Sequence, residues 1–332
     1  MLDTSLKNAV DNVKNVPNFL VTTNGKNTNI AGNAFSQNGV IHFSGDYSTG
    51  IQVASALRPN AFVVDPSKYS NNNSRSLVRA DNKENGYIQL DGSHSYGMKL
   101  SGTALHVDSN DYAPSSLVSY VANNGLILIS GSYDTAINGN SAKGSSAGIA
   151  KLSEAKWSSL KTIFNNGKIY VGGNNNAGIL LESIYDDIVT NNGIITIDKA
   201  YNLFNNPNSA VNYSNAVATS NAGIRLQSYN TADAAQGSLE GVNKREINIK
   251  NGSGNVGIYA LDVANTNNIL GSHSYHILGE NTTTGKINID GTNVGMMAQD
   301  DSGTTNFKTI IKNSGTINVG GKNSIGMYTK DK

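Results

Sequence analysis

The chain has 332 residues, of which 49 are Asn and 35 are Gly, so one residue in four favours turns. Its 25 basic and 24 acidic residues leave a formal net charge of +1, which excludes the positive field that would attract nucleic acid. The absence of cysteine excludes disulfides, thiolate metal sites and cysteine nucleophiles. The longest aliphatic run, Leu126–Ile129, is too short to span a bilayer, so we expect no direct membrane insertion.

The first residues predict a helix. Within Ser5–Val13 the side chains of Leu6, Val10 and Val13 fall on one helical face, so residues 1–16 could cap the exposed end of the fold. The start lacks the basic and apolar regions of a secretory signal, and the chain stops directly after a repeat. We therefore expect a fragment of a longer protein.

An internal repeat occupies residues 38–328. Its first half reads Asn-Gly-x-Ile-x-apolar, and its second half opens with Gly followed by Ile or Met. Five copies begin at Asn38, Asn85, Asn124, Asn166 and Asn192, and three degenerate copies begin at Lys244, Thr284 and Ser314.

Alignment of the eight copies predicts short strands. One isoleucine is shared by every first half, with an apolar residue two positions later: Ile41, Ile88, Ile127, Ile169, Ile195, Ile247, Ile287 and Ile317. This period of two indicates a strand with one buried face. A second strand follows the Gly, led by Ile51, Met98, Ile149, Ile179, Ile224, Ile258, Met296 and Met327, and a third apolar segment usually precedes the Asn-Gly pair.

Three strands per repeat predict an all-β, right-handed parallel β-helix in which the isoleucines stack as a ladder. Steps of 26 to 52 residues between copies suit a solenoid, whose repeats contact only their neighbours, better than a closed β-propeller. A leucine-rich repeat lacks its Leu-x-x-Leu-x-Leu pattern. The right hand follows from the chirality of parallel crossovers. We expect the Asn residues before the first Gly to form an amide ladder, in a turn that tolerates a left-handed backbone.

Extra residues are expected to form loops on this scaffold, at 57–76, 132–147, 199–220, 227–243 and 261–281. A further excursion, Ser153–Leu160, predicts a short helix that Trp157 packs onto the rod. Because loops on a rigid scaffold often carry function, the candidate ligand-binding side chains are those of Tyr133, Asp134, Tyr201, Tyr213, His273, Tyr275 and His276. Ordinary solvated loop residues are the competing interpretation of each.

No catalytic residue, metal site or cofactor is expected. Asp91, Asp198 and Asp290 share one repeat position, but they lie two or three repeats apart, roughly 10–15 Å, which exceeds the carboxylate separation of glycosidases. His273 and His276 lack a third zinc ligand. The acidic pairs at 186–187 and 300–301 lack the spacing of a calcium loop.

Two segments carry a resemblance to a known family. Residues 313–320 read Asn-Ser-Gly-Thr-Ile-Asn-Val-Gly and precede Ser-Ile-Gly-Met-Tyr at 324–328, and residues 285–291 read Gly-Lys-Ile-Asn-Ile-Asp-Gly and precede Val-Gly-Met at 294–296. They resemble the passenger repeats of large fusobacterial type V (type Va) autotransporter adhesins. The Asn excess and the choice of Lys over Arg, 20 to 5, agree. The resemblance implies a secreted virulence factor at the Gram-negative cell surface, attached to the outer membrane by a C-terminal β-barrel absent from this chain.

The leading expectation is a non-catalytic adhesin segment that binds host glycans, host receptors or other bacteria through loops on a β-helical rod. Two alternatives stay open. A carbohydrate-active β-helix enzyme, a lyase or a hydrolase, would need two or three carboxylates close together on neighbouring repeats. A structural spacer without a ligand would leave binding to other parts of the protein.

Overall fold

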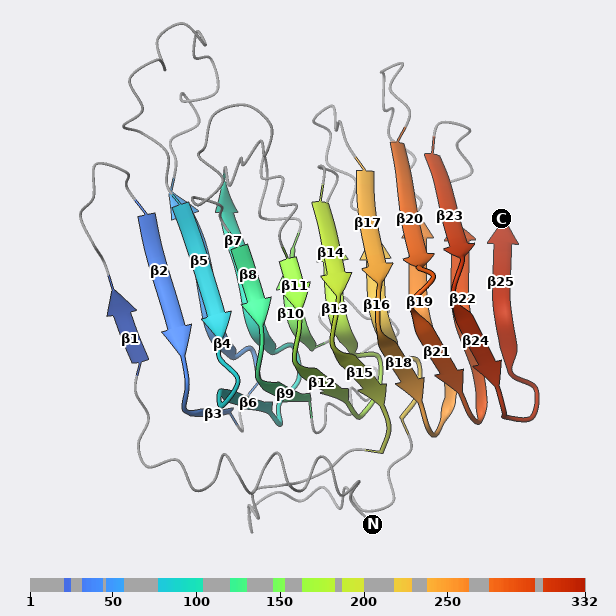
Figure 1. Cartoon of the computed structure of the whole chain (residues 1–332), viewed down its shortest axis with the longest axis horizontal. Helices are drawn as coiled ribbons and strands as arrows, with labels where there is room; N and C mark the ends of the chain where they lie inside the picture. The colour runs from blue at the N-terminus through green and yellow to red at the C-terminus, as the bar shows by residue number, and fades with distance from the viewer. Residues whose placement is uncertain are drawn as a thin grey trace, which may run out of the picture.

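The computed structural model describes residues 21–24, 32–43, 46–56, 77–103, 120–129, 146–152, 163–182, 187–199, 218–228, 238–262, 275–301 and 307–331. Every regular element in these ranges is a β-strand, and the strands form three sheets (Figure 1). The same ranges hold no helix that could cross a membrane. The helices expected at 1–16 and at Ser153–Leu160 lie outside them.

The three sheets are named A, B and C. Sheet A contains β1 (Val21–Asn24), β2 (Gly32–Gln37), β5 (Leu77–Asn82), β8 (Tyr120–Asn123), β11 (Ile163–Asn165), β14 (Asp187–Asn191), β17 (Ser238–Asn243), β20 (Tyr275–Asn281) and β23 (Phe307–Asn313). Sheet B contains β3 (Val40–Phe43), β6 (Tyr87–Leu90), β9 (Leu126–Ile129), β12 (Lys168–Val171), β15 (Ile194–Ile197), β18 (Glu246–Ile249), β21 (Lys286–Ile289) and β24 (Thr316–Val319). Sheet C contains β4 (Thr49–Ala56), β7 (Tyr96–Thr103), β10 (Ala147–Lys151), β13 (Ala177–Glu182), β16 (Ala222–Gln227), β19 (Ser253–Asp262), β22 (Thr292–Asp300) and β25 (Ile325–Asp331).

Each repeat contributes one strand to each sheet. The chain passes from sheet A to sheet B to sheet C and then returns to sheet A one strand further along (Figure 1). Every strand pair is parallel except β1–β2, which is antiparallel. β1 therefore covers the first edge of sheet A, the kind of edge that otherwise invites unwanted pairing. This stacking of parallel strands is consistent with a β-solenoid.

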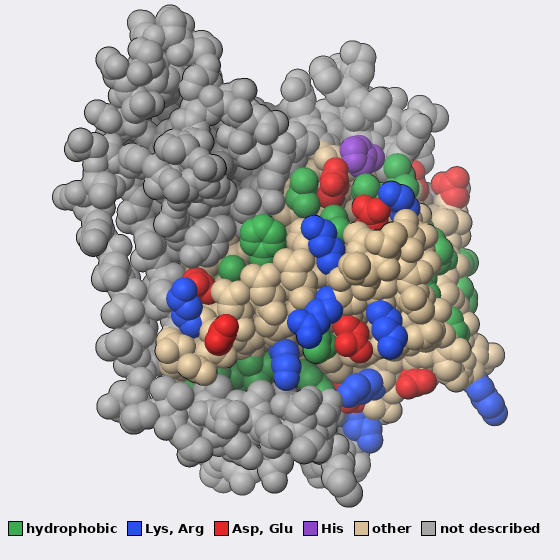
Figure 2. Space-filling view, in the orientation of Figure 1, with side chains coloured by type: hydrophobic (Ala, Val, Ile, Leu, Met, Phe, Trp, Pro, Cys, Tyr) green, Lys and Arg blue, Asp and Glu red, His purple; other side chains and the backbone are tan. Residues whose placement is uncertain are grey.

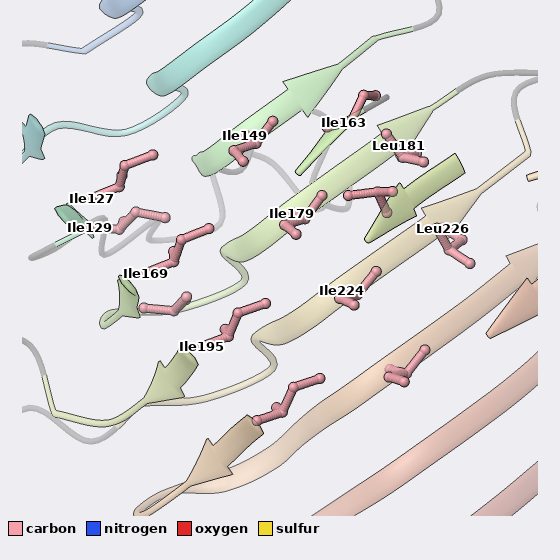
Figure 3. Close-up of a cluster of buried hydrophobic side chains, with 14 of the residues drawn as sticks. Ile127, Ile129, Ile149, Ile163, Ile169, Ile179, Leu181, Ile195, Ile224 and Leu226 are labelled. Carbon is pink, nitrogen blue, oxygen red and sulfur yellow. The ribbon is translucent and has the colours of Figure 1, made fainter. Parts of the chain in front are cut away.

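The core consists of stacked side-chain ladders between the sheets. The predicted isoleucine ladder is confirmed, because the eight residues pair in register from Ile41 on β3 to Ile317 on β24. Figure 3 shows Ile127, Ile169 and Ile195 of sheet B lined up beside the ladder of sheet C. Nearly all ladder members are fully buried, so each repeat places its aliphatic side chains on those of its neighbours.

The glycine that opens the second half of each repeat is required by close packing. A Cβ atom on Gly178 would lie 2.7 Å from the carbonyl oxygen of Gly223 and 2.9 Å from Cγ2 of Ile195. Gly97, Gly148 and Gly223 have the same surroundings in their own repeats. Only glycine therefore lets sheet C approach the isoleucine ladder this closely.

Two loop predictions extend too far. β17 occupies 238–243 of the loop expected at 227–243, and β20 occupies 275–281 of the loop expected at 261–281. Gly241 and Gly279 interrupt the apolar pattern of these strands, which hid them in the sequence. A Cβ atom on Gly241 would lie 2.9 Å from Cγ2 of Ile224, and a Cβ atom on Gly279 would lie 2.6 Å from Cγ2 of Ile258. Close packing therefore requires glycine at both positions. The strand β10 likewise begins at Ala147, the last residue of the loop expected at 132–147.

The prediction of one buried face per strand is wrong at β6 and β9, the second and third strands of sheet B. All four residues of β6 and of β9 are buried, including the outward-facing Gln89 and Leu128. Further along the sheet, β18 alternates half-buried and buried residues as predicted. The outer face of sheet B thus changes from buried to partly exposed along the rod.

Candidate binding surface

Three corners connect the sheets, and the corner between sheets A and B is uniform. Every A-to-B connection has two or four residues, from 38–39 between β2 and β3 to 314–315 between β23 and β24. A buried amide ladder runs along it and ends at an exposed residue, Asn313. Each Nδ2 donates to the next Oδ1 at 2.7–2.8 Å, in the order Asn82, Asn123, Asn165, Asn191, Asn243, Asn281 and Asn313. Because every internal amide has a partner on both sides, the ladder fixes the register of neighbouring repeats.

The predicted amide ladder lies outside the buried one and is shorter. Asn192 donates to Asn166, and Asn166 donates to Asn124, at 2.9 Å each. The expected left-handed backbone is wrong here, since the described residues with positive φ are all at the corner between sheets B and C. Glycine is required at the A-to-B corner because a Cβ on Gly125 would lie 2.2 Å from the carbonyl oxygen of Gly86.

A different ladder runs along the B-to-C corner. Its members are Ser48, Ser95, Ser146, Asn176, Asn221, Asn255, Asn293 and Ser324, each two residues before the second glycine of its repeat. Each backbone N–H donates to the side-chain oxygen of the next member, for example from Asn176 to Asn221 at 2.8 Å. The pattern was present in the sequence, but the alignment centred on the first glycine missed it.

Connections of variable length flank sheet C on both sides. At the C-to-A corner they range from four residues, 183–186, to twenty residues, 57–76. At the B-to-C corner, 130–146 and 198–221 are long, and the others have two to five residues. The invariant A-to-B corner is thus opposite sheet C, and the part of the surface that can vary between repeats surrounds sheet C.

Positive φ angles recur at one position of the B-to-C corner. Tyr47, His94, Asn175, Ser220 and Asn323 have φ between 55° and 57°, and each lies three residues before the second glycine of its repeat. Asn and Gly suit this conformation, whereas most side chains pay about 1–2 kcal/mol for it. Tyr47 of the first repeat therefore has a backbone conformation that a bulky side chain disfavours, whereas His94 of the second repeat is of a type found there more often.

The two aromatic residues form an exposed stack. The rings of Tyr47 and His94 lie 4.7 Å apart between centroids, at an angle of 25°, and Tyr47 is 77% exposed. Beside them, the exposed Asp46 accepts a hydrogen bond from the backbone N–H of Ser93 at 2.7 Å, and Tyr47 N–H donates to the Ser93 carbonyl at 2.9 Å. We call Asp46, Tyr47, Ser93 and His94 the aromatic corner. Hydrogen bonds between the two repeats hold it in place.

A polar chain continues from this corner across the outer face of sheet B. His42 Nε2 lies 2.5 Å from Asp91 Oδ2, and Gln89 Nε2 donates to Asp91 Oδ1 at 2.7 Å. Tyr87 in turn donates to Gln89. Burial, and secondarily the charge of Asp91, raises the pKa of Tyr87 well above its usual value. Tyr87 is therefore a neutral hydrogen-bond donor at physiological pH.

Most of the predicted binding residues cannot be placed. Tyr133, Asp134, Tyr201, Tyr213 and His273 lie outside the described residues. Tyr275 begins β20, where it pairs with Phe307. His276 follows it, and its Nε2 lies 3.5 Å from Glu240 Oε1 on the neighbouring strand. Only Tyr275 and His276 of the predicted residues thus lie in the described part of the chain, as consecutive residues of β20, and the prediction for the other five stays a prediction.

Carboxylates do stack on neighbouring repeats, at a place that the sequence analysis missed. Asp91, Asp198 and Asp290 are separated by two or three strands of sheet B, as predicted. By contrast, Asp262, Asp300 and Asp331 pair in register at the ends of β19, β22 and β25. Each lies five residues after the second glycine of its repeat, so the spacing was visible in the sequence. Among the described residues, no group of three or more His, Asp or Glu side chains has the geometry of a metal site.

The outer face of sheet C also carries a half-buried cation. Both terminal nitrogens of Arg225 donate to Asn175 Oδ1 at 3.3 Å, and the guanidinium lies 5.8 Å from the ring centroid of Tyr259. Burial lowers the pKa of Arg225, and burial raises that of Tyr259. Tyr259 donates to Gln299 at 2.7 Å, which donates to Asp301. These contacts join four successive repeats across sheet C.

Charged side chains of both signs are mixed on the face of the molecule that Figure 2 shows. Figure 2 shows Lys and Arg side chains interspersed with Asp and Glu over the visible face of the described residues. Lys312 and Glu280, for example, pair at 2.8 Å.

A comparison of the chain with models of protein families, with curated proteins and with solved structures finds no match.

Proposed function

We propose that the chain is a non-catalytic adhesin segment: a right-handed parallel β-helix that binds its ligand on the side of sheet C. In this account it belongs to the passenger of a large autotransporter adhesin, displayed outside a Gram-negative cell. Its partners are host glycans, host receptor proteins or other bacteria.

One observation carries this proposal. The A-to-B corner keeps two or four residues in all eight repeats, whereas connections of up to twenty-four residues enter and leave sheet C. A solenoid tolerates such insertions because its repeats contact only their neighbours. Insertions confined to one side of a rigid scaffold are typical of a recognition surface, since binding residues are concentrated on loops. A spacer would have no reason to restrict them to that side.

The test is an array of host glycans and host receptor proteins, probed with the intact chain and with two variants. One variant shortens the connections 130–145 and 200–217. The control variant replaces the exposed Lys83, Glu84 and Asn85 of the A-to-B corner with alanine. We expect saturable binding by the intact chain and the control, and loss of binding on shortening. Absence of binding by the intact chain would contradict the proposal and favour a spacer.

The in-register carboxylates favour a second candidate, a carbohydrate-active enzyme. Neighbouring strands lie about 4.8 Å apart, close to the roughly 5–5.5 Å that separates the two carboxyl groups of retaining glycosidases. Asp262, Asp300 and Asp331 are paired in register on consecutive strands, so their backbones have that spacing. Release of reducing ends or of unsaturated sugars from a polysaccharide panel, abolished in Asp300→Asn, would support it. No release by the intact chain would eliminate it.

A further inference from the structure

We propose that the aromatic corner is a carbohydrate-binding site, with the ring of Tyr47 as the platform for a neutral pyranose and the carboxylate of Asp46 as the acceptor for its hydroxyl groups. The inference rests on the proposed adhesin function and names a ligand class and a place for it.

The first argument is the cost of the tyrosine. The corner has a positive φ in repeat after repeat, and Asn175, Gly254 and Asn323 are of the residue types that suit it. Tyr47 has the same conformation with a large side chain, and 77% of that residue is exposed. A strained residue that buries little surface contributes nothing evident to folding, and strain of this kind tends to mark functional positions.

The second argument is preorganisation. The ring of His94 supports one face of Tyr47 at 4.7 Å. The backbone of Ser93 fixes Asp46 and Tyr47. Its N–H donates to the Asp46 carboxylate, and its carbonyl oxygen accepts a hydrogen bond from the N–H of Tyr47. Ser48, the next residue, is held by Ser95. The platform and the carboxylate are therefore in place before a ligand arrives, which reduces the entropy lost on binding.

The third argument is chemical fit. A pyranose presents an apolar C–H face that packs on an aromatic ring and hydroxyl groups that donate to a carboxylate. The charge of the Asp46 carboxylate disfavours an anionic ligand. A cationic side chain would also be attracted, but an exposed cation–π contact and an exposed ion pair each stabilise weakly. Stacking combined with charge-assisted hydrogen bonds therefore favours the neutral sugar.

The test separates binding from stability. The probe is an array of neutral oligosaccharides with lysine-rich peptides as a comparison ligand, applied to the intact chain and to variants. Tyr47→Asn places a residue suited to positive φ at the corner, so its Tm should equal or exceed that of the unsubstituted chain, while sugar affinity falls at least tenfold. Tyr47→Phe should retain binding because it keeps the ring, and Asp46→Ala should reduce it. Ser220→Asn, at the same corner four repeats further along, should leave binding unchanged.

The outcomes distinguish this inference from the proposed function. If Tyr47→Asn binds the same sugars as the unsubstituted chain, the site lies elsewhere and the inference is wrong, although the adhesin function stands. Binding of lysine-rich peptides or receptor proteins but of no sugar would overturn the ligand class alone. An intact chain that binds neither sugars nor proteins would overturn both.

Discussion

The lysine at position 151 replaces an aliphatic residue in the core ladder of sheet C. It pairs in register with Leu100 on one side and Leu181 on the other. Its amine forms an ion pair with Asp187 of sheet A, and both side chains are fully buried. Burial lowers the pKa of Lys151, although the charge of Asp187 and a hydrogen bond to it act in the opposite direction. The two charged groups therefore lose their hydration and form a buried ion pair with each other.

Breaking this pair should be far more harmful than removing it. Lys151→Leu leaves the carboxylate of Asp187 buried without its partner, and we expect a loss of about 3–5 kcal/mol in the free energy of unfolding. The double variant Lys151→Leu/Asp187→Leu should recover that loss, because leucine fits the ladder. Urea denaturation measures both. A single variant as stable as the double one would show that the pair is not desolvated.

The same pair predicts a pH dependence. Because the pKa of Lys151 is lowered in the folded state, the unfolded state binds more protons in the window just below the ordinary lysine value, about 10.4. The free energy of unfolding should therefore rise with pH across that window, relative to Lys151→Leu/Asp187→Leu, which lacks both groups. Urea denaturation of the two proteins between pH 8 and pH 10 tests the sign. A relative fall in stability would contradict the lowered pKa.

At the scale of the element, the buried amide ladder joins each strand of sheet A to the next. Asn191 accepts from Asn165 and donates to Asn243, and it is completely buried. Asn191→Ala leaves one donor and one acceptor unsatisfied, each costing about 1–3 kcal/mol. Its neighbour Asn192 belongs to the exposed ladder, where water can replace a lost partner, so Asn192→Ala should cost below about 1 kcal/mol. Equal thermal destabilisation of the two variants would contradict this division.

Glycines of sheet C offer a second matched pair. Gly178→Ala would force a Cβ against Gly223 and Ile195, and overpacking of this kind typically costs about 1–3 kcal/mol. For Gly326, at the same repeat position in the last repeat, the nearest atom to a Cβ would be Cγ2 of Val319 at 3.8 Å, an ordinary van der Waals contact. Gly326→Ala should therefore have little effect in a thermal melt. Destabilisation of the same size at both positions would show that backbone freedom, not contact, selects the glycine.

The sequence predicts the two strands that follow the first and the second glycine position of each repeat. Ile41 and its seven equivalents, together with the apolar residues two positions later, keep a strict period of two. It does not predict β17 or β20, since Gly241 and Gly279 are chosen by contact with isoleucines of another sheet. The aromatic corner was equally hidden. Tyr47 and His94 are 47 residues apart, and only the register of β4 with β7 brings their rings together.

At the scale of the whole molecule, every repeat advances the chain by one strand in each sheet, whatever the length of its insertions. Register is held at the A-to-B corner by the Asn ladder and at the B-to-C corner by the Ser/Asn ladder. The spacing between neighbouring copies along the chain ranges from 26 to 52 residues. The rise should nevertheless stay at about 4.8 Å per repeat.

Electron paramagnetic resonance between pairs of spin labels tests this claim most directly, because the chain has no cysteine and each introduced one is unique. Labels at the exposed Asn85, Lys244 and Ser314 occupy the A-to-B corner of the second, sixth and eighth repeats. We predict narrow distributions centred near 19 Å for 85–244 and near 29 Å for 85–314, at about 4.8 Å per repeat. Broad distributions, or distances that do not follow the number of repeats between the labels, would contradict the solenoid and the binding surface built on it.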